Sequence, residues 1–219
     1  MAQMRHIQAA IFDLDGLLLD TEPMYLAATT EVLARYGCEL EMTVLRRQIG
    51  RPSVEGMQWL AEYYDLELTG QEIHEQREAL LESLLPDAAP RPGAVELTAA
   101  LVAGGVPIAV GTSSTRDTLA RKIVNHGLWI GTFSCVVTRD EVERGKPHPD
   151  IFLGAAACLG VAPEACVVFE DARSGVEAAR AAGMSVVMVP TEGVDTSGLE
   201  PDALLESLAE FDPASWGML

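Results

Sequence analysis

The pattern of apolar and polar positions divides the chain into a short apolar run, a helical stretch and a regular alternation of strands and helices. Residues 7–12 are apolar and include β-branched and aromatic side chains, which is typical of a strand buried on both faces of a parallel sheet. Beyond residue 92 the pattern predicts helices over 93–103, 115–126, 149–159, 174–182 and 201–209, and strands over 106–110, 133–137, 167–169 and 185–189.

Between these two parts no segment alternates as a strand would. Thr21 and Pro23 suit the start of a helix that Gly37 ends, and further helices are expected over 42–49, 53–64 and 71–85. The sequence therefore predicts an α/β protein with a Rossmann-like parallel sheet core, formed by residues 1–20 and 88–219. Residues 21–87 form an inserted helical bundle, whose core is expected to include Trp59, Tyr63 and Tyr64.

The composition narrows the class of protein. The 219 residues are 48% hydrophobic and carry a formal net charge of −18, which argues against non-specific binding to nucleic acid or to an anionic membrane. No apolar run approaches the roughly 18 residues that cross a bilayer. The first residues lead directly into a strand and leave no room for a signal peptide. We therefore expect a cytoplasmic protein with no nucleic-acid or membrane partner.

The four cysteines show no spacing typical of a metal site. Cys38, Cys135, Cys158 and Cys166 are far apart, and the last three lie in apolar runs. Small buried thiols in a reducing compartment are the expected interpretation, rather than metal ligands or a disulfide framework.

Two carboxylates follow the first strand directly. If the chain is still extended there, Asp13 and Asp15 point the same way, because side chains alternate with a period of two. Like charges held that close need a cation, a shared proton or a phosphoryl group nearby. Gly16 lets the backbone turn and a ligand approach. Taken alone, this motif is equally consistent with an acidic turn.

The topology brings other polar groups to the same edge, because ligands bind at the carboxyl ends of the strands in open parallel sheets. Each of these groups has an ordinary explanation by itself: a hydroxyl bonded to local backbone, a surface lysine or a helix N-cap. Together they are typical of a Mg²⁺ site that handles phosphate. The groups are Asp13 and Asp15, Thr112 and Ser113, Lys146, and the pair Glu170 and Asp171.

These four motifs, in this order, resemble the signature motifs of the haloacid dehalogenase-like superfamily of phosphotransferases. The helical insertion after the first motif is similar to the small cap of its first cap class. The opening of the chain is most similar to the group of pseudouridine-5'-phosphatases and related sugar-phosphate phosphatases. The likeness extends over essentially the whole chain, including the stretches 91–94, 145–147, 168–171, 181–184 and 211–213.

The resemblance implies a role for each motif residue. Asp13 would be the nucleophile that forms a phosphoaspartyl enzyme, and Asp15 the general acid and then the general base. Thr112 and the backbone N–H of Ser113 would hold the phosphate, whose charge Lys146 would neutralise. Mg²⁺ would be bound by Asp13, the Asp15 carbonyl and Asp171, with Glu170 a ligand or an outer group.

The resemblance also implies a substrate class. A small cap suits a sugar phosphate or a nucleoside-type monophosphate, and Gly50, Arg51 and Glu22 are candidate substrate contacts. A phosphosugar mutase of the β-phosphoglucomutase type is the alternative, although those mutases carry a His where this chain has Tyr25. A 2-haloacid dehalogenase would lack Asp15, and the intact motifs argue against a silent interaction protein. A monomer or a weak homodimer is expected.

Overall fold

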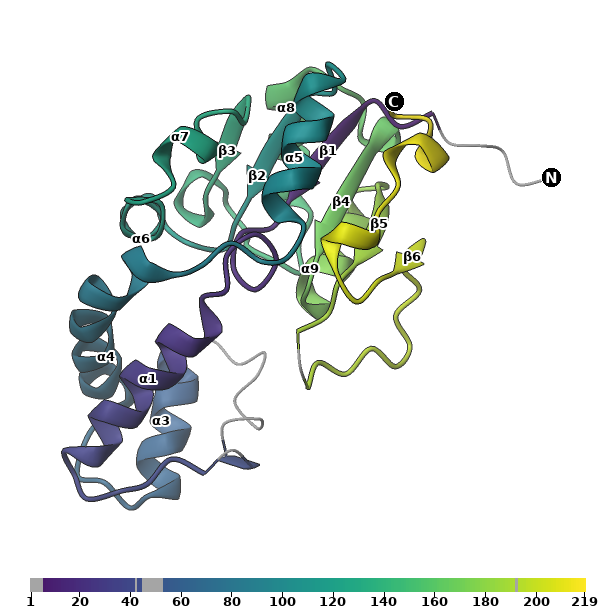
Figure 1. Ribbon diagram of the computed structural model, residues 1–219. Coiled ribbons are helices and arrows are strands. Elements are labelled where there is room, and N and C mark those ends of the chain that lie inside the picture. The colour runs from purple at the N-terminus through teal and green to yellow at the C-terminus, as the bar shows by residue number, and fades with distance from the viewer. Residues whose placement is uncertain (1–5, 42, 45–52, 192) are drawn as a thin grey trace. The chain divides into compact units, whose positions relative to one another are not determined.

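The computed structural model describes residues 6–41, 43–44, 53–191 and 193–219 (Figure 1). The chain divides into two compact units, a core unit of residues 1–20 and 89–219 and a helical unit of residues 21–88. No helix among the described residues is long and apolar enough to span a bilayer.

The core unit is built on one six-stranded sheet in the order β3-β2-β1-β4-β5-β6, with every neighbouring pair parallel. This confirms the predicted parallel α/β class. The strands connect through helices because parallel neighbours need a crossover. The strands are β1 (Ala9–Phe12), β2 (Ile108–Gly111), β3 (Cys135–Val137), β4 (Cys166–Glu170), β5 (Ser185–Met188) and β6 (Ala203–Leu204).

Apolar side chains cover both faces of this sheet, as the run at 7–12 predicts. On one face, Ile11 and Val168 pack against residues of α8 (Asp150–Leu159) and α9 (Arg173–Ala181). On the other face, the Phe12 ring stacks on Phe169 at a centroid distance of 4.6 Å, and Phe169 meets Phe211 edge-on. Every residue of β1, β2, β4 and β5 is buried.

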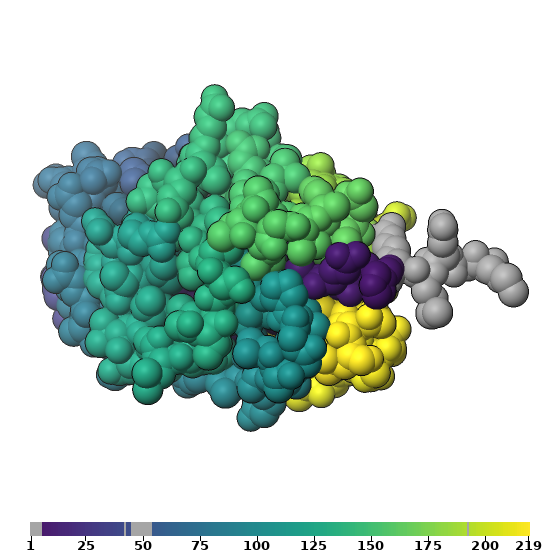
Figure 2. Space-filling view, turned by 90° about the horizontal axis from the view of Figure 1, so that it is seen from above, coloured from purple at the N-terminus to yellow at the C-terminus, as the bar shows by residue number. Residues whose placement is uncertain are grey.

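The C-terminal part of the chain closes the second face. The 3₁₀ turn Leu208–Glu210 packs against α5 (Ala94–Ala103). Figure 2 shows the last residues, in yellow, beside the purple start of the chain and the teal segment of α5. Further 3₁₀ turns are Arg139–Glu141, Pro163–Ala165 and Pro213–Trp216.

The register of the sheet decides which side chains meet. Phe12 is paired with Val110 on one side and with Phe169 on the other. The residues that follow these three positions, Asp13, Gly111 and Glu170, therefore lie at one level, and the Asp13 N–H donates to the Phe169 carbonyl at 3.0 Å. The carboxyl ends of β1, β2 and β4 thus form a common edge.

The helical unit has its own apolar core. Its elements are α1 (Glu22–Ala34), α3 (Ser53–Tyr63), α4 (Gly70–Leu84) and the 3₁₀ turn Leu85–Asp87. Trp59 and Tyr64 pack against this core, whereas Tyr63 is exposed. Thr69 begins α4 with a capping box to Glu72. Most of the helix expected over 42–49 lies outside the described residues.

The helix predicted over 115–126 is present but shorter than expected, and a second helix follows it. The first, α6 (Arg116–Lys122), ends at Ile123, and α7 (Gly127–Ile130) follows. Gly127 therefore begins a helix rather than ending one. The Trp129 indole N–H donates to Thr98 Oγ1 of α5 at 2.9 Å, which fixes α7 on the core.

The helix predicted over 201–209 is wrong. Ala203 and Leu204 form the edge strand β6, paired with Val187 and Met188. The Asp202 side chain accepts a hydrogen bond from the Val186 N–H at 2.8 Å. The Arg180 guanidinium lies 2.8 Å from the same Asp202 carboxylate. Pairing with a neighbouring strand outweighs the local helical pattern.

The cysteine prediction requires a correction as well. Cys135 of β3 and Cys158 of α8 form a disulfide, whereas they were expected to be unpaired. Their Cα atoms are 6.6 Å apart, because α8 packs directly on β3. Spacing along the chain does not reveal this contact. Cys38 and the buried Cys166 are free thiols.

Candidate active site

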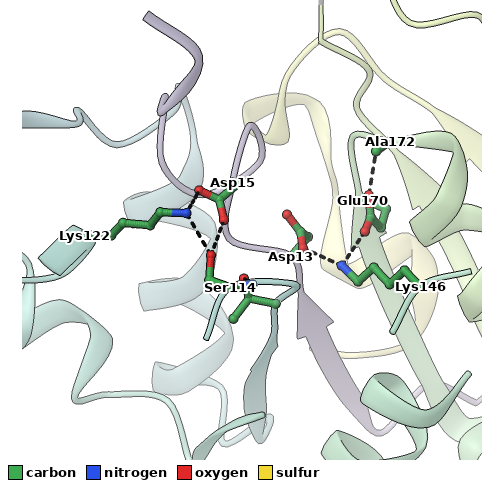
Figure 3. A network of polar contacts seen from close by, with 8 residues as sticks. Asp13, Asp15, Ser114, Lys122, Lys146, Glu170 and Ala172 are labelled. Carbon is green, nitrogen blue, oxygen red and sulfur yellow. Dashed lines mark hydrogen bonds and ion pairs between the residues drawn. The ribbon is translucent and has the colours of Figure 1, made fainter. Parts of the chain in front are cut away.

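Asp13, the first carboxylate of the first motif, belongs to a buried ionic network. The Lys146 ammonium contacts Asp13 Oδ1 and donates to Glu170 Oε1 at 2.6 Å (Figure 3). Glu170 Oε2 accepts the Ala172 N–H at 2.8 Å. The three charged side chains are each at most 8% exposed. The strand ends and the loop before α8 therefore bring Asp13, Lys146 and Glu170 together, as predicted.

A third carboxylate joins this network. Asp13, Glu170 and Asp171 each offer an oxygen, and these oxygens all lie within 4.8 Å of one another. Burial raises the pKa of Asp13 to about 7, with the Lys146 charge opposing the rise and Glu170 adding to it. Burial also raises the pKa of Asp171, and the Glu170 charge raises it further. We call Asp13, Glu170 and Asp171 the acid cluster.

The acid cluster fits a hard divalent cation. Three buried carboxylates face one ammonium, that of Lys146, so the cluster lacks positive charge. Burial is the main cause of the raised pKa values of Asp13 and Asp171, and the charge of Glu170 adds to both. Carboxylate oxygens are the ligands that Mg²⁺ prefers, together with water and substrate phosphate.

The backbone at Gly16 makes room for Asp171. Gly16 has φ +81°, and a Cβ atom there would lie 2.3 Å from Asp171 Oδ2. Thr191 Oγ1 lies 3.5 Å from the same oxygen. The N-cap residue of α9 is Ala172 and not Asp171. The Asp171 carboxyl thus belongs to the acid cluster and does not cap the helix.

Asp15 belongs to a separate network. Its Oδ1 accepts a hydrogen bond from Lys122 Nζ at 2.5 Å and its Oδ2 accepts one from Ser114 Oγ at 2.9 Å, while Lys122 also donates to Ser114 Oγ at 2.8 Å (Figure 3). Neither Lys122 nor Ser114 is among the site residues predicted from the sequence. One feature of the sequence could have indicated Lys122. It lies three residues after Leu119, which places both residues on the same, buried face of the predicted helix.

The loop after β2 holds the remaining core residues. Thr112 is fully buried, and its Oγ1 accepts the Ser114 N–H at 3.0 Å. This is the local bond that the sequence left open as an alternative, and it leaves the hydroxyl proton for a second acceptor. Ser113 is exposed. The loop thus carries the Thr112 hydroxyl and the Ser113 N–H, while the N–H groups of Thr112 and Ser114 already donate to Val137 O and Thr112 Oγ1.

Three further substrate contacts were predicted among residues of the helical unit. Glu22 is an exposed residue at the start of α1 in the helical unit, and Thr21 occupies the N-cap of that helix without a side-chain capping bond. Gly50 and Arg51 lie outside the described residues. These three substrate contacts stay predictions.

Comparison with known proteins agrees with this geometry. Residues 10–189 match the family model described as haloacid dehalogenase-like hydrolase. The chain is 37% identical to a probable pseudouridine-5'-phosphatase of Drosophila melanogaster, over 98% of this chain and 96% of that one. It is 35% identical to the phosphorylated carbohydrates phosphatase of Thermotoga maritima, over 92% and 91%.

A solved structure shows the same architecture. The HAD family hydrolase of Deinococcus radiodurans R1, determined with bound phosphate and sodium, superimposes with a TM-score of 0.82. It is 30% identical and covers 98% of both chains. On the family match and these identities, the chain belongs to the haloacid dehalogenase-like hydrolases.

Proposed function

We propose that this chain, a phosphatase of the haloacid dehalogenase-like family, is Mg²⁺-dependent and hydrolyses a small phosphomonoester through a phosphoaspartyl intermediate. The substrate class is a sugar phosphate or a nucleoside-type monophosphate. One observation carries the proposal: Asp13 and Asp15, two residues apart, lie in separate networks with Lys146 and Lys122. Two neighbouring carboxylates can therefore take two different roles.

In the first half-reaction, an Asp13 oxygen attacks phosphorus and the bond from phosphorus to the ester oxygen breaks. That oxygen takes a proton from the Asp15 carboxyl and leaves as an alcohol. Thr112 Oγ1 and the Ser113 N–H would bind phosphate oxygens, and Lys146 would neutralise charge on Asp13 and the phosphoryl group. In the second half-reaction, water gives a proton to Asp15 and attacks phosphorus. The bond between phosphorus and the Asp13 oxygen breaks, which frees the Asp13 carboxylate and releases inorganic phosphate.

The metal would be bound by Asp13, Asp171 and the backbone carbonyl of Asp15. When bound, Mg²⁺ supplies positive charge that removes the repulsion between the nucleophilic carboxylate and the phosphate. Glu170 has one oxygen on Lys146 and the other on the Ala172 N–H. We therefore place Glu170 as the outer carboxylate that orients Lys146, with direct ligation the alternative for it.

The helical unit would act as a cap that limits substrate size. A cap of residues 21–87 that closes over the site would exclude water and leave room for a small ligand. Gly50, Arg51 and Glu22 are the residues we assign to substrate recognition. The relatives act on phosphate esters of these kinds, according to their names, which supports the class.

We expect Mg²⁺-dependent phosphate release from several small phosphomonoesters, pseudouridine 5'-monophosphate and 2-deoxyglucose 6-phosphate among them. Asp13→Asn keeps the size of the side chain but removes the nucleophile, so turnover should fall by about 10³-fold or more. The measurement is initial phosphate release, with the melting temperature as a folding control. A folded Asp13→Asn that keeps its activity would contradict the nucleophile. Interconversion of sugar phosphates without phosphate release would favour the mutase.

Metal should stabilise the fold in a pH-dependent way. Because burial raises the Asp13 pKa from 3.8 to about 7, its protonation favours the folded state at low pH, and this contribution is lost as the pH rises through about 7. We expect the melting temperature in Mg²⁺ minus that in EDTA to grow between about pH 5 and 8. At 100 times Kd, binding contributes about 2.7 kcal/mol, or roughly 5–10 °C. Superimposed melts at pH 8 would contradict the metal site.

Gly16→Ala should damage the metal site specifically. Its Cβ would displace the Asp171 carboxyl, so the variant should lose both its activity and its stabilisation by Mg²⁺. Gly105→Ala is the matched control, because Gly105 has φ +77° and nothing within 4 Å. Both variants adopt left-handed backbone at about 1–2 kcal/mol. Equal responses of the two variants to Mg²⁺ in thermal melts would argue against Asp171 as a ligand.

A further inference from the structure

Lys122 is a buried charge outside the motifs of the family. It lies on α6, its side chain is 2% exposed, and its ammonium donates to Asp15 Oδ1 and to Ser114 Oγ. Ser114 in turn donates to Asp15 Oδ2, which closes a triangle of three hydrogen bonds (Figure 3). Both oxygens of the Asp15 carboxylate therefore accept a hydrogen bond.

If only the stability of the fold mattered, a buried lysine at position 122 would be unfavourable. Its neighbour on the buried face of α6 is Leu119, and an apolar side chain at residue 122 would need no desolvation of an ammonium group. The ammonium reaches Asp15 across 107 positions of sequence. These contacts place the Lys122 ammonium against the carboxylate of Asp15, the second aspartate of the first motif.

We propose that Lys122 is a positioning residue for Asp15, with Ser114 as its helper. This inference rests on the proposed function, in which Asp15 gives a proton to the leaving oxygen and later takes one from water. A proton passes efficiently only between groups held within hydrogen-bond distance. The bonds from Lys122 to Oδ1 and from Ser114 to Oδ2 fix the plane of the Asp15 carboxyl.

The reaction distinguishes positioning of Asp15 from general support of the fold. An alkyl phosphate needs a proton on its leaving oxygen as the bond to phosphorus breaks, whereas p-nitrophenyl phosphate releases a stable phenolate. The value of kcat/KM reports the step in which Asp13 takes the phosphoryl group. A misplaced Asp15 should therefore lower kcat/KM for the alkyl ester far more than for the p-nitrophenyl ester.

The experiment compares Lys122→Met with the wild-type chain in Mg²⁺ on these two esters. We expect kcat/KM to fall about 100-fold for the alkyl phosphate and less than about tenfold for p-nitrophenyl phosphate. The inhibition constant of inorganic phosphate should stay unchanged, because Lys122 is not assigned to the phosphate. Lys122→Arg, which keeps a buried donor, should recover part of the alkyl phosphate activity.

Arg121→Met is the matched control, since it removes a positive charge from the next, partly exposed residue of α6. It should lower the two rates equally or not at all. If Lys122→Met does not fold, as judged by its melting temperature, Ser114→Ala provides the test, because it removes the bond to Oδ2 without adding a large side chain. Ser114→Ala should show the same selective loss with a smaller magnitude.

Asp15→Asn separates this inference from the proposed function. Full alkyl phosphate activity in Asp15→Asn would overturn the acid–base role of Asp15, and the inference with it. Selective loss in Asp15→Asn, with equal losses on both esters in folded Lys122→Met and in Ser114→Ala, would overturn the positioning role alone. Selective loss in all three supports it.

Discussion

The site depends on the separation of two like charges at the end of one strand. Asp13 and Asp15 are two residues apart, and without separate partners their repulsion would favour protonation or a distorted loop. Lys146 reaches Asp13 from the loop before α8, and Lys122 reaches Asp15 from α6. Each lysine comes from the segment that follows a different strand, so both ion pairs depend on the folded sheet.

The order of the strands makes this possible. With β1 between β2 and β4, the loop after β2 supplies Ser114 and leads into α6, while the end of β4 supplies Glu170. The pairing of Phe12 with both Val110 and Phe169 sets these groups at one level. A slip of one residue in either pair would turn the carboxylates to the opposite face. The apolar packing of the sheet thus also aligns the site.

The sequence predicted the parts of the site that motifs define. The acidic pair, the polar ends of three strands and the Lys146 loop could be placed because sheet topology brings strand ends together. Lys122 could not be placed in this way, because its importance depends on which face of α6 is buried. The edge strand at Ala203–Leu204 and the Cys135–Cys158 pair depend on tertiary contacts that local propensity does not encode. The missing information was contact between distant segments.

The two networks differ in their partners, and this difference supports placing the proposed cation at the acid cluster. Among the described residues, both oxygens of Asp15 accept hydrogen bonds, one from Lys122 and one from Ser114. In the acid cluster, three carboxylates share Lys146. A phosphate dianion approaching that cluster, in a chain with net charge −18, meets more negative than positive charge. The charge of Lys146 is already shared between Asp13 and Glu170, so in the proposed mechanism a divalent ion would supply the further positive charge that phosphate binding requires.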